Sequence, residues 1–170
     1  MQKTIIRYGL LSGTTILVLL LIVSLIGFET FGFEYGQLIG YSSMLLAMLF
    51  VFFGIRSYRS STENGLLSFW QGFKTGIGIA LIACLFYTIG WLFINEFIYP
   101  DFMDEYTKYY AEQLKSGGLS AKEIEAKMNE MNSMVEMYKN PLWKFTFTFL
   151  EIFPVGLIVS LISALVLKKK

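Results

Sequence analysis

The sequence predicts an all-α membrane protein with four transmembrane helices and a helical hairpin outside the membrane between the third and fourth of them. Three observations predict this fold. The chain of 170 residues is 55% hydrophobic and only 16% charged, whereas about a quarter of the residues in a soluble domain are charged. Its charged residues are rare in four long windows and concentrated between those windows. Each window is long enough to cross a hydrocarbon layer of roughly 30 Å as a helix.

The four apolar windows are the predicted spans, at residues 8–28, 35–55, 75–97 and 142–167 of a single membrane domain that covers 1–170. Hydrocarbon offers no hydrogen bonds to a peptide backbone, so only helices and closed barrels can cross it. The windows lack the alternation of polar and apolar residues that barrel strands show, which favours helices. The first window is longer than the core of a cleaved signal peptide, and no cleavage motif of small residues follows it. We therefore expect an uncleaved anchor.

The basic residues indicate how the spans are oriented, because cytoplasmic loops of membrane proteins are enriched in Lys and Arg. At one end of the predicted spans Glu63 is the only acidic residue. The basic residues at that end are Lys3, Arg7, Arg56, Arg59, Lys74, Lys168, Lys169 and Lys170. We therefore expect a bacterial inner-membrane protein with both termini and the loop 56–74 in the cytoplasm. The turn 29–34 and the loop 98–141 are then expected on the outer side.

Three of these basic residues, Arg56, Arg59 and Lys74, flank the predicted cytoplasmic loop. We interpret them as interfacial anchors that also fix the topology. The alternative is a site for lipid headgroups or for another anionic ligand.

The long outer loop has the pattern of two helices, between about residues 100 and 140. The first is predicted at 101–115, and Gly117 and Gly118 follow it as helix-ending residues. Ser120 and Glu123 form a capping box that starts the second helix. Asn140 precedes a proline, which disfavours helix at that position and ends the second helix.

Both hairpin helices are predicted to be amphipathic. The inward face of the first is Phe102, Tyr106, Tyr109 and Gln113, and the apolar stripe of the second is Ile124, Met128, Met131, Val135 and Tyr138. An amphipathic helix usually buries its stripe against its own protein, so we expect the hairpin to pack on itself and on the outer ends of the spans. The alternative is a docking surface for a partner, since methionine-rich stripes adapt to varied partners.

Small residues recur at every fourth position on all four predicted spans. They are Gly9 and Gly13; Gly36 and Gly40; Gly72, Gly76, Ala80, Cys84 and Thr88; and Gly156, Ser160 and Ala164. Such stripes let membrane helices approach one another closely. We interpret them as packing within one chain, with a homo-oligomer as the alternative.

Glu151 is the acidic residue that lies well inside a predicted span. A carboxylate at that depth costs a few kcal/mol on insertion scales, so it must be protonated, paired or in contact with water. Counting along the helices at about 1.5 Å per residue places five polar residues near its level. They are Tyr41, Ser42 and Ser43 of the second span and Tyr87 and Thr88 of the third.

Pro154 follows Glu151 within the same span and is predicted to break the helix. Proline has no N–H, so it leaves the carbonyl of Leu150 without its helical partner. Broken helices beside acidic residues form ion and proton sites in many transporters. A single Glu bonded to a neighbouring Tyr or Ser can also serve packing alone.

The composition argues against an enzyme. Histidine is absent and Cys84 is the one cysteine, so the commonest general base is missing and no internal disulfide or thiolate cluster is possible. No phosphate loop, paired carboxylates or nucleophile–base pair is recognisable. No basic run interleaved with aromatic residues indicates nucleic acid. We expect no metal or cofactor, and we expect the lipid bilayer and a second copy or another membrane protein as partners.

Five segments of the chain resemble a known bacterial membrane family. They are KTIIRYGLLSG, IGYSSMLLAMLFVFFGIRSYR, FWQGFKTGIGIALIACLFYTIGW, PDFMDEY and YKNPLWKFTFTFLEIFPVGLIVSLISALVLKKK. In these segments the chain is similar to the family catalogued as domain of unknown function 4199, found mainly in Bacteroidota. The resemblance covers nearly the whole chain. It implies a four-span inner-membrane protein and carries over no activity and no functional residues.

Two functional hypotheses remain. The first is a non-enzymatic membrane component that acts through protein or lipid partners. The second is a small ion- or proton-coupled transporter that uses Glu151 and the Pro154 break. They differ in one structural expectation: a transporter requires a cavity that reaches Glu151, whereas the first hypothesis expects a dry bundle in which Glu151 bonds to Tyr41 or Ser42.

Overall fold

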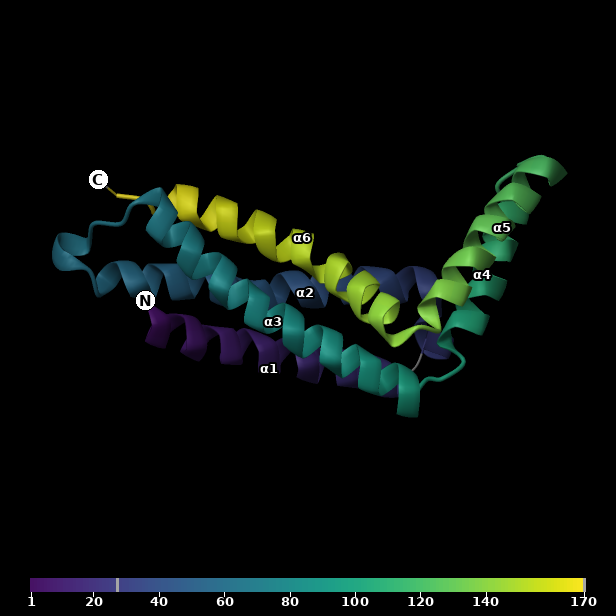
Figure 1. The fold of residues 1–170 in the computed structure, drawn as a ribbon, viewed down its shortest axis with the longest axis horizontal. Helices are drawn as coiled ribbons and strands as arrows, with labels where there is room; N and C mark the ends of the chain where they lie inside the picture. Colours follow the sequence, from purple (N-terminus) through teal and green to yellow (C-terminus); the bar gives the residue numbers. More distant parts are fainter. Residues whose placement is uncertain (27, 170) are drawn as a thin grey trace.

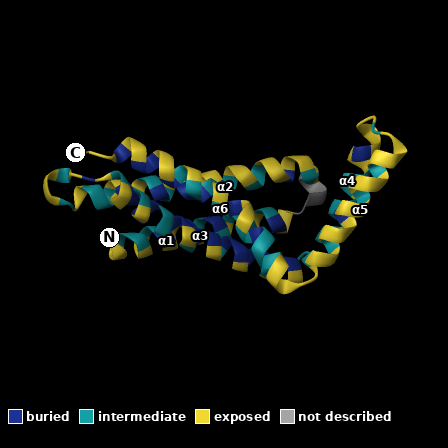
Figure 2. Ribbon diagram, turned by 45° about the horizontal axis from the view of Figure 1, so that its top comes forward, coloured by how far each residue is buried: buried dark blue, intermediate teal, exposed yellow. Residues whose placement is uncertain are grey.

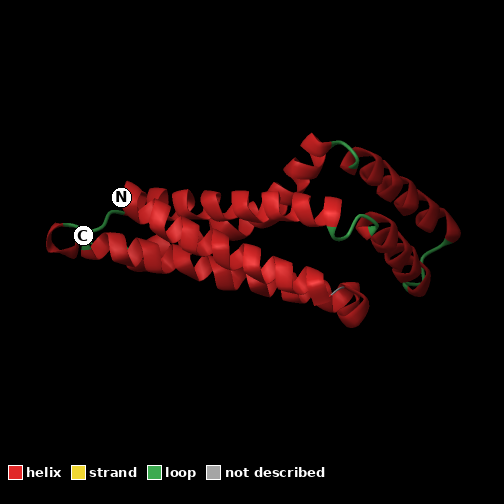
Figure 3. Ribbon diagram, turned by 90° about the horizontal axis from the view of Figure 1, so that it is seen from below, coloured by secondary structure: helices red, strands yellow, loops and turns green. Residues whose placement is uncertain are grey.

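A computed structural model describes the backbone of residues 1–26 and 28–169, and their side chains except those of 28–31. The described chain is helical apart from short connections (Figure 3). Its elements are α1 (Gln2–Ile26), α2 (Phe28–Ser60), the short 3₁₀ helix η1 (Glu63–Gly65), α3 (Phe69–Phe97), α4 (Phe102–Ser116), α5 (Ala121–Tyr138) and α6 (Pro141–Leu167).

Four long helices, α1, α2, α3 and α6, run side by side as an elongated bundle (Figures 1 and 3). Both termini lie at one end of the bundle, and α4 and α5 project from the other end (Figure 1). These four helices are long and apolar enough to cross a membrane, which confirms the predicted number of spans. Buried residues concentrate along the inward faces of the bundle, while the hairpin is largely exposed (Figure 2).

Two connections differ from the predicted boundaries. Helix α3 begins at Phe69, earlier than predicted, because the Ser68 hydroxyl accepts from the Gln71 N–H at 3.2 Å and the Gln71 side chain accepts from the Ser68 N–H. The predicted turn 29–34 is helical from Phe28, with a break at Gly32, whose φ of 70° favours glycine. Residue 27, in the predicted first span, lies outside the described residues.

The predicted helical hairpin is confirmed as two helices. The capping box that starts α5 is present: the Ser120 N–H donates to Glu123 Oε2 at 2.9 Å, and the Ser120 hydroxyl accepts from the Glu123 N–H. The Asn140 side chain accepts from the Leu142 N–H at 2.9 Å and thereby caps α6. Only two residues, Lys139 and Asn140, separate α5 from α6.

The predicted apolar stripe of α5 coincides with its least exposed residues. Met131 is buried, and Ile124, Met128, Val135 and Tyr138 are half-buried. On α4 the predicted face is partly wrong, because Gln113 is exposed and Leu114 beside it is buried. The packing face of α4 is therefore rotated by one residue at its far end.

Helices α3 and α6 run antiparallel and approach each other closely at small residues. A Cβ added at Gly156 of α6 would lie 2.9 Å from Ala80 Cβ, and one added at Gly76 of α3 would lie 3.1 Å from Ser160 Cβ. One turn further, a Cβ at Gly72 would lie 3.3 Å from Ala164 Cβ. The paired positions are thus four residues apart on both helices and run in opposite directions along α3 and α6.

The glycines of α1 serve the other side of α3. Gly9 receives the side chain of Ile82, and Gly13 receives the ring of Phe86, each within 3 Å of where a Cβ would stand. Helix α3 consequently lies between α1 and α6 and contains more buried residues than any other span. The small-residue stripes of α1, α3 and α6 thus pack within one chain.

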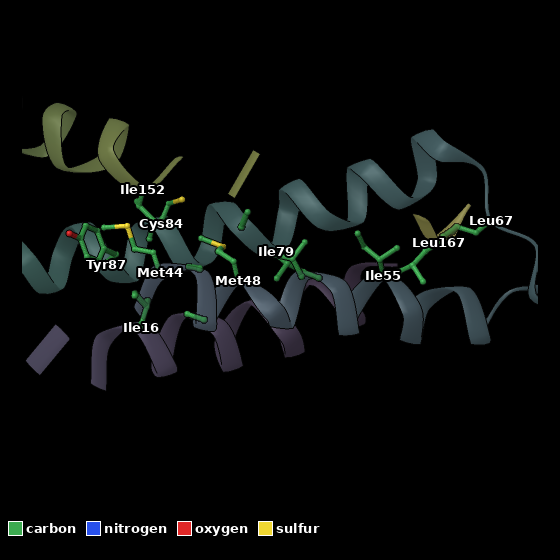
Figure 4. Packing of buried hydrophobic residues seen from close by; sticks show 14 residues of the cluster. Ile16, Met44, Met48, Ile55, Leu67, Ile79, Cys84, Tyr87, Ile152 and Leu167 are labelled. Carbon is green, nitrogen blue, oxygen red and sulfur yellow. The ribbon is translucent and has the colours of Figure 1, made fainter. Parts of the chain in front are cut away.

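The side chains at the centre of the bundle form one continuous core. Figure 4 shows it as a row along the bundle axis, with Tyr87 at one end and Leu67 and Leu167 at the other. Met44 and Met48 of α2 lie next to Tyr87 in this row and are 1% and 0% exposed. Between Tyr87 and the end that carries the termini, the interior of the bundle is therefore filled by packed side chains.

Backbone contacts close the end of the bundle that carries the termini. Leu67, just before α3, and Lys169, just after α6, exchange two backbone hydrogen bonds of 2.9 Å. Arg59 of α2 donates to the carbonyl of Leu167 at 3.3 Å, which satisfies a group left free at the end of α6. The start of α3 and the end of α6 are thereby tied together.

The contact between Gly156 and Ala80 predicts that Gly156→Leu destabilises the protein. A larger side chain would force α3 and α6 apart, and overpacking of this kind costs about 1–3 kcal/mol. We expect a lower midpoint of thermal unfolding in detergent. Gly40→Ala is the matched control, since nothing lies within 4 Å of a Cβ there. Equal midpoints for Gly156→Leu and the unsubstituted protein would contradict the assigned contact.

Candidate functional site

A cavity of about 390 Å³ lies where the bundle meets the hairpin, and all six α-helices line it. Glycines on α2 contribute to this space. Gly36 and Gly40 line the cavity, and a Cβ at Gly40 would have nothing within 4 Å. Gly40 of α2 therefore leaves a space, whereas Gly54 further along the same helix receives the side chain of Ile79.

Glu151 of α6 lines this cavity at the deep end of the site. Its carboxylate Oε2 accepts a hydrogen bond of 3.2 Å from the Tyr87 hydroxyl of α3. Tyr87 itself is 7% exposed and belongs to the core, whereas Glu151 is an exposed residue that faces the open space. The ion pair found among the described residues, Lys139–Glu136, lies elsewhere, so no basic side chain neutralises this carboxylate in the described part.

Aromatic rings from five helices form much of the cavity wall. Trp91 of α3 donates its indole N–H to the Tyr138 hydroxyl of α5 at 2.6 Å, which ties the hairpin to the bundle. The Phe102 ring of α4 meets the Trp91 ring edge-to-face, with ring centroids 4.8 Å apart. Tyr41 of α2 and Phe147 of α6 complete this part of the lining.

The hairpin is held over the cavity by a second aromatic contact. Phe33 of α2 lies among three rings of α4, with centroid distances of 5.9 Å to Phe102, 5.6 Å to Tyr106 and 5.2 Å to Tyr109. The apolar faces predicted for the hairpin are thus used to cover the cavity.

Burial raises the pKa of the Tyr138 hydroxyl above its ordinary value, so this hydroxyl stays protonated at neutral pH.

The six predicted polar residues are not all brought together. Glu151, Tyr41, Ser43 and Tyr87 line the cavity, although the Ser43 hydroxyl donates to the Ile39 carbonyl of its own helix at 2.8 Å. Ser42 is exposed and does not line the cavity. Thr88 is fully buried between helices, and its hydroxyl has no hydrogen-bond partner among the described residues. The bond to Glu151 comes from Tyr87, not from Tyr41 or Ser42.

Two further predictions are corrected or refined here. Pro154 is an exposed residue inside α6, which is helical on both sides of it, so the predicted break is absent. One lost backbone bond is tolerated because the rest of the α3–α6 contact holds the helix. Of the basic residues, Arg59 bonds to the end of α6, while Arg56 and Lys74 are exposed.

Sequence reasoning missed most of the cavity wall. Trp91 and Phe33 were not among the predicted site residues, yet each joins the bundle to the hairpin. Their position at the hairpin ends of α3 and α2 was the available signal. A second hollow, of about 430 Å³ between α1 and α3, is lined by Leu17, Leu21, Phe86, Ile89, Gly90 and Phe93 and offers no polar side chain.

The arrangement suits binding more than bond-making chemistry. Within the described residues no group of three His, Cys, Asp or Glu side chains is placed to hold a metal ion. The cavity contains one carboxylate with a hydroxyl donor beside it, and its other lining residues are aromatic, aliphatic, thioether, amide, hydroxyl or glycine. This combination of an apolar wall and a few placed polar groups is typical of small-molecule sites.

Comparison with known proteins gives a family and no activity. No curated protein matches the chain, and no solved structure matches it. The model of one family, described as protein of unknown function (DUF4199), matches residues 7–169. Because this match covers nearly the whole sequence, the chain belongs to the DUF4199 family.

Proposed function

We propose that this chain is a non-enzymatic, multi-pass protein of the bacterial inner membrane that binds a small amphipathic molecule in the cavity at its hairpin end. The cavity that reaches Glu151 carries the proposal. Its volume of about 390 Å³ falls in the range of roughly 300–1,000 Å³ that small-molecule sites occupy. Its apolar walls suit the hydrophobic part of such a molecule, and Glu151, Tyr87 and Gln37 offer polar contacts.

The proposed orientation places this cavity on the outer side of the membrane. The end of the bundle with both termini carries Lys3, Arg7, Arg56 and Arg59, and Lys and Arg are enriched on the cytoplasmic side. The hairpin at the opposite end carries most of the acidic residues. A ligand would then enter from the outer aqueous side or from the outer leaflet.

A transporter is the second candidate. The cavity that reaches Glu151 meets the structural expectation of this hypothesis and stands in place of the dry bundle that the first hypothesis expects. Acidic residues within spans often mark ion or proton pathways. Below this residue the core around Met44 and Met48 is closed, so transport would require a second state in which that part opens. Binding requires no such state, and it is therefore the function that the geometry supports better.

The orientation predicts which cysteine substitutions react with a membrane-impermeant maleimide in spheroplasts. In a Cys84→Ser background we expect Ser133→Cys on α5 to be labelled at once. Ser60→Cys, at the other end of the bundle, should be labelled only after permeabilisation. Both positions are exposed, so accessibility differs by membrane side alone. The reverse pattern would contradict the proposed orientation.

The cavity predicts that Gly40→Leu reduces ligand occupancy without unfolding the protein. The new side chain would fill the open space beside Gly40. Native mass spectrometry of protein purified from native membranes should show a bound small molecule that this variant loses. Ser42→Leu, on the same helix but away from the cavity, should keep it. A ligand retained at full occupancy in Gly40→Leu would place the site elsewhere.

The transporter hypothesis predicts proton movement that depends on Glu151. Liposomes that contain the protein and a trapped pH dye should acidify faster than empty liposomes under an imposed potential, because the carboxylate can carry a proton. Liposomes with Glu151→Gln should match empty ones. Equal rates for the two protein-containing preparations would exclude this role for Glu151.

A further inference from the structure

The described lining of the cavity includes one side chain of a type that can carry a full charge at neutral pH. Among the lining residues whose side chains the structure describes, Glu151 is the only acidic one, and none is Lys or Arg. The carboxylate has the Tyr87 hydroxyl as its donor at 3.2 Å. A carboxylate held in an apolar site is unfavourable without an opposite charge. The missing counter-charge is therefore a property that a ligand could supply.

The rest of the wall has the chemistry that attracts organic cations. Trp91, Tyr41, Tyr87 and Tyr138 line the same cavity as Glu151, and the faces of aromatic rings attract ammonium groups. Lys144 shows this preference at the edge of the site, because its ammonium lies 5.3 Å from the centroid of the Tyr138 ring. A cavity wall that combines aromatic rings with one carboxylate favours a positively charged, partly hydrophobic ligand.

Other ligand classes fit this wall less well. An anion would meet the Glu151 carboxylate, and the described lining residues include no Lys or Arg; the basic side chain of Lys144 lies at the edge of the site against the Tyr138 ring. A bare divalent cation prefers several oxygen ligands, and the described lining residues offer one carboxylate. A neutral apolar molecule would leave the Glu151 carboxylate without a counter-charge.

Given the proposed ligand-binding function, we propose that the cavity binds a small organic ammonium ion, with its cationic nitrogen beside Glu151 and its apolar part among the rings of Tyr41, Trp91 and Phe147. The same nitrogen would lie within the reach of the ring faces, so charge and aromatic contacts select the ligand together. The thioether groups of Met131 and Met134 on α5 line the hairpin side of the cavity and adapt to varied apolar groups.

The test uses benzyltrimethylammonium as the probe and neopentylbenzene as its neutral isostere, in which carbon replaces the charged nitrogen. Equilibrium dialysis is carried out with the full chain in lipid nanodiscs, against empty nanodiscs. We expect saturable binding of the cation at one site per chain, and at least tenfold weaker binding of the isostere. Benzenesulfonate, an anion of similar size, should not bind.

Variants separate the charge from the fold. Glu151→Gln keeps an acceptor for Tyr87 but removes the charge, and it should weaken cation binding at least tenfold while leaving that of the isostere unchanged. Glu151→Asp keeps the charge and should retain most of the affinity. Glu96→Gln removes an exposed carboxylate of α3 outside the cavity and should bind as the unsubstituted protein does.

Different failures have different meanings. If cation and isostere bind equally, or if Glu151→Gln binds the cation at full strength, the cation preference is overturned while the ligand site of the proposed function stands. If Gly40→Leu binds both probes as well as the unsubstituted protein does, the probes bind outside the cavity and the assignment is overturned. If neither probe binds saturably, the inference fails, and the bound molecule sought by native mass spectrometry decides the proposed function separately.

Discussion

The close antiparallel contact between α3 and α6 is the constraint on which the rest of the structure depends. Gly156 against Ala80 and Gly76 against Ser160 let the two backbones approach at a distance that larger side chains would prevent. In hydrocarbon, where apolar surface gains little from burial between helices, this close fit is a main source of association. It also sets the register that brings Tyr87 of α3 opposite Glu151 of α6.

The same kind of residue has opposite consequences on α2. Gly9 and Gly13 on α1 receive side chains of α3, whereas Gly40 receives nothing and leaves open space beneath the hairpin. The difference arises from what lies opposite each glycine, because Gly40 borders the cavity at the hairpin end of the bundle. Both effects are needed for the site. The close packing of α6 on α3 holds Glu151 in place, and the open space beside Gly40 forms part of the cavity that Glu151 lines.

Sequence patterns predicted the elements well and their mutual orientation less well. Hydropathy identified the four spans, and the Ser120–Glu123 capping box and the Met131 stripe identified the hairpin, because these signals are local. The rotation of a long apolar helix about its axis has no such signal when both its faces are apolar. Ser42 and Thr88, predicted at the level of Glu151, therefore do not line the cavity with it. The pairing of Leu67 with Lys169 uses only backbone groups and has no sequence signal.

The tie between Leu67 and Lys169 gives the bundle a fixed end and a free end. At the fixed end, α3 and α6 are fastened by backbone bonds; at the other, they are joined through the whole α4–α5 hairpin. Because only two residues join α5 to α6, a tilt of the hairpin would also tilt the end of α6 to which it is joined. A guest that spreads the free end would thus turn α6 about its fastened end and leave the end with the termini unchanged.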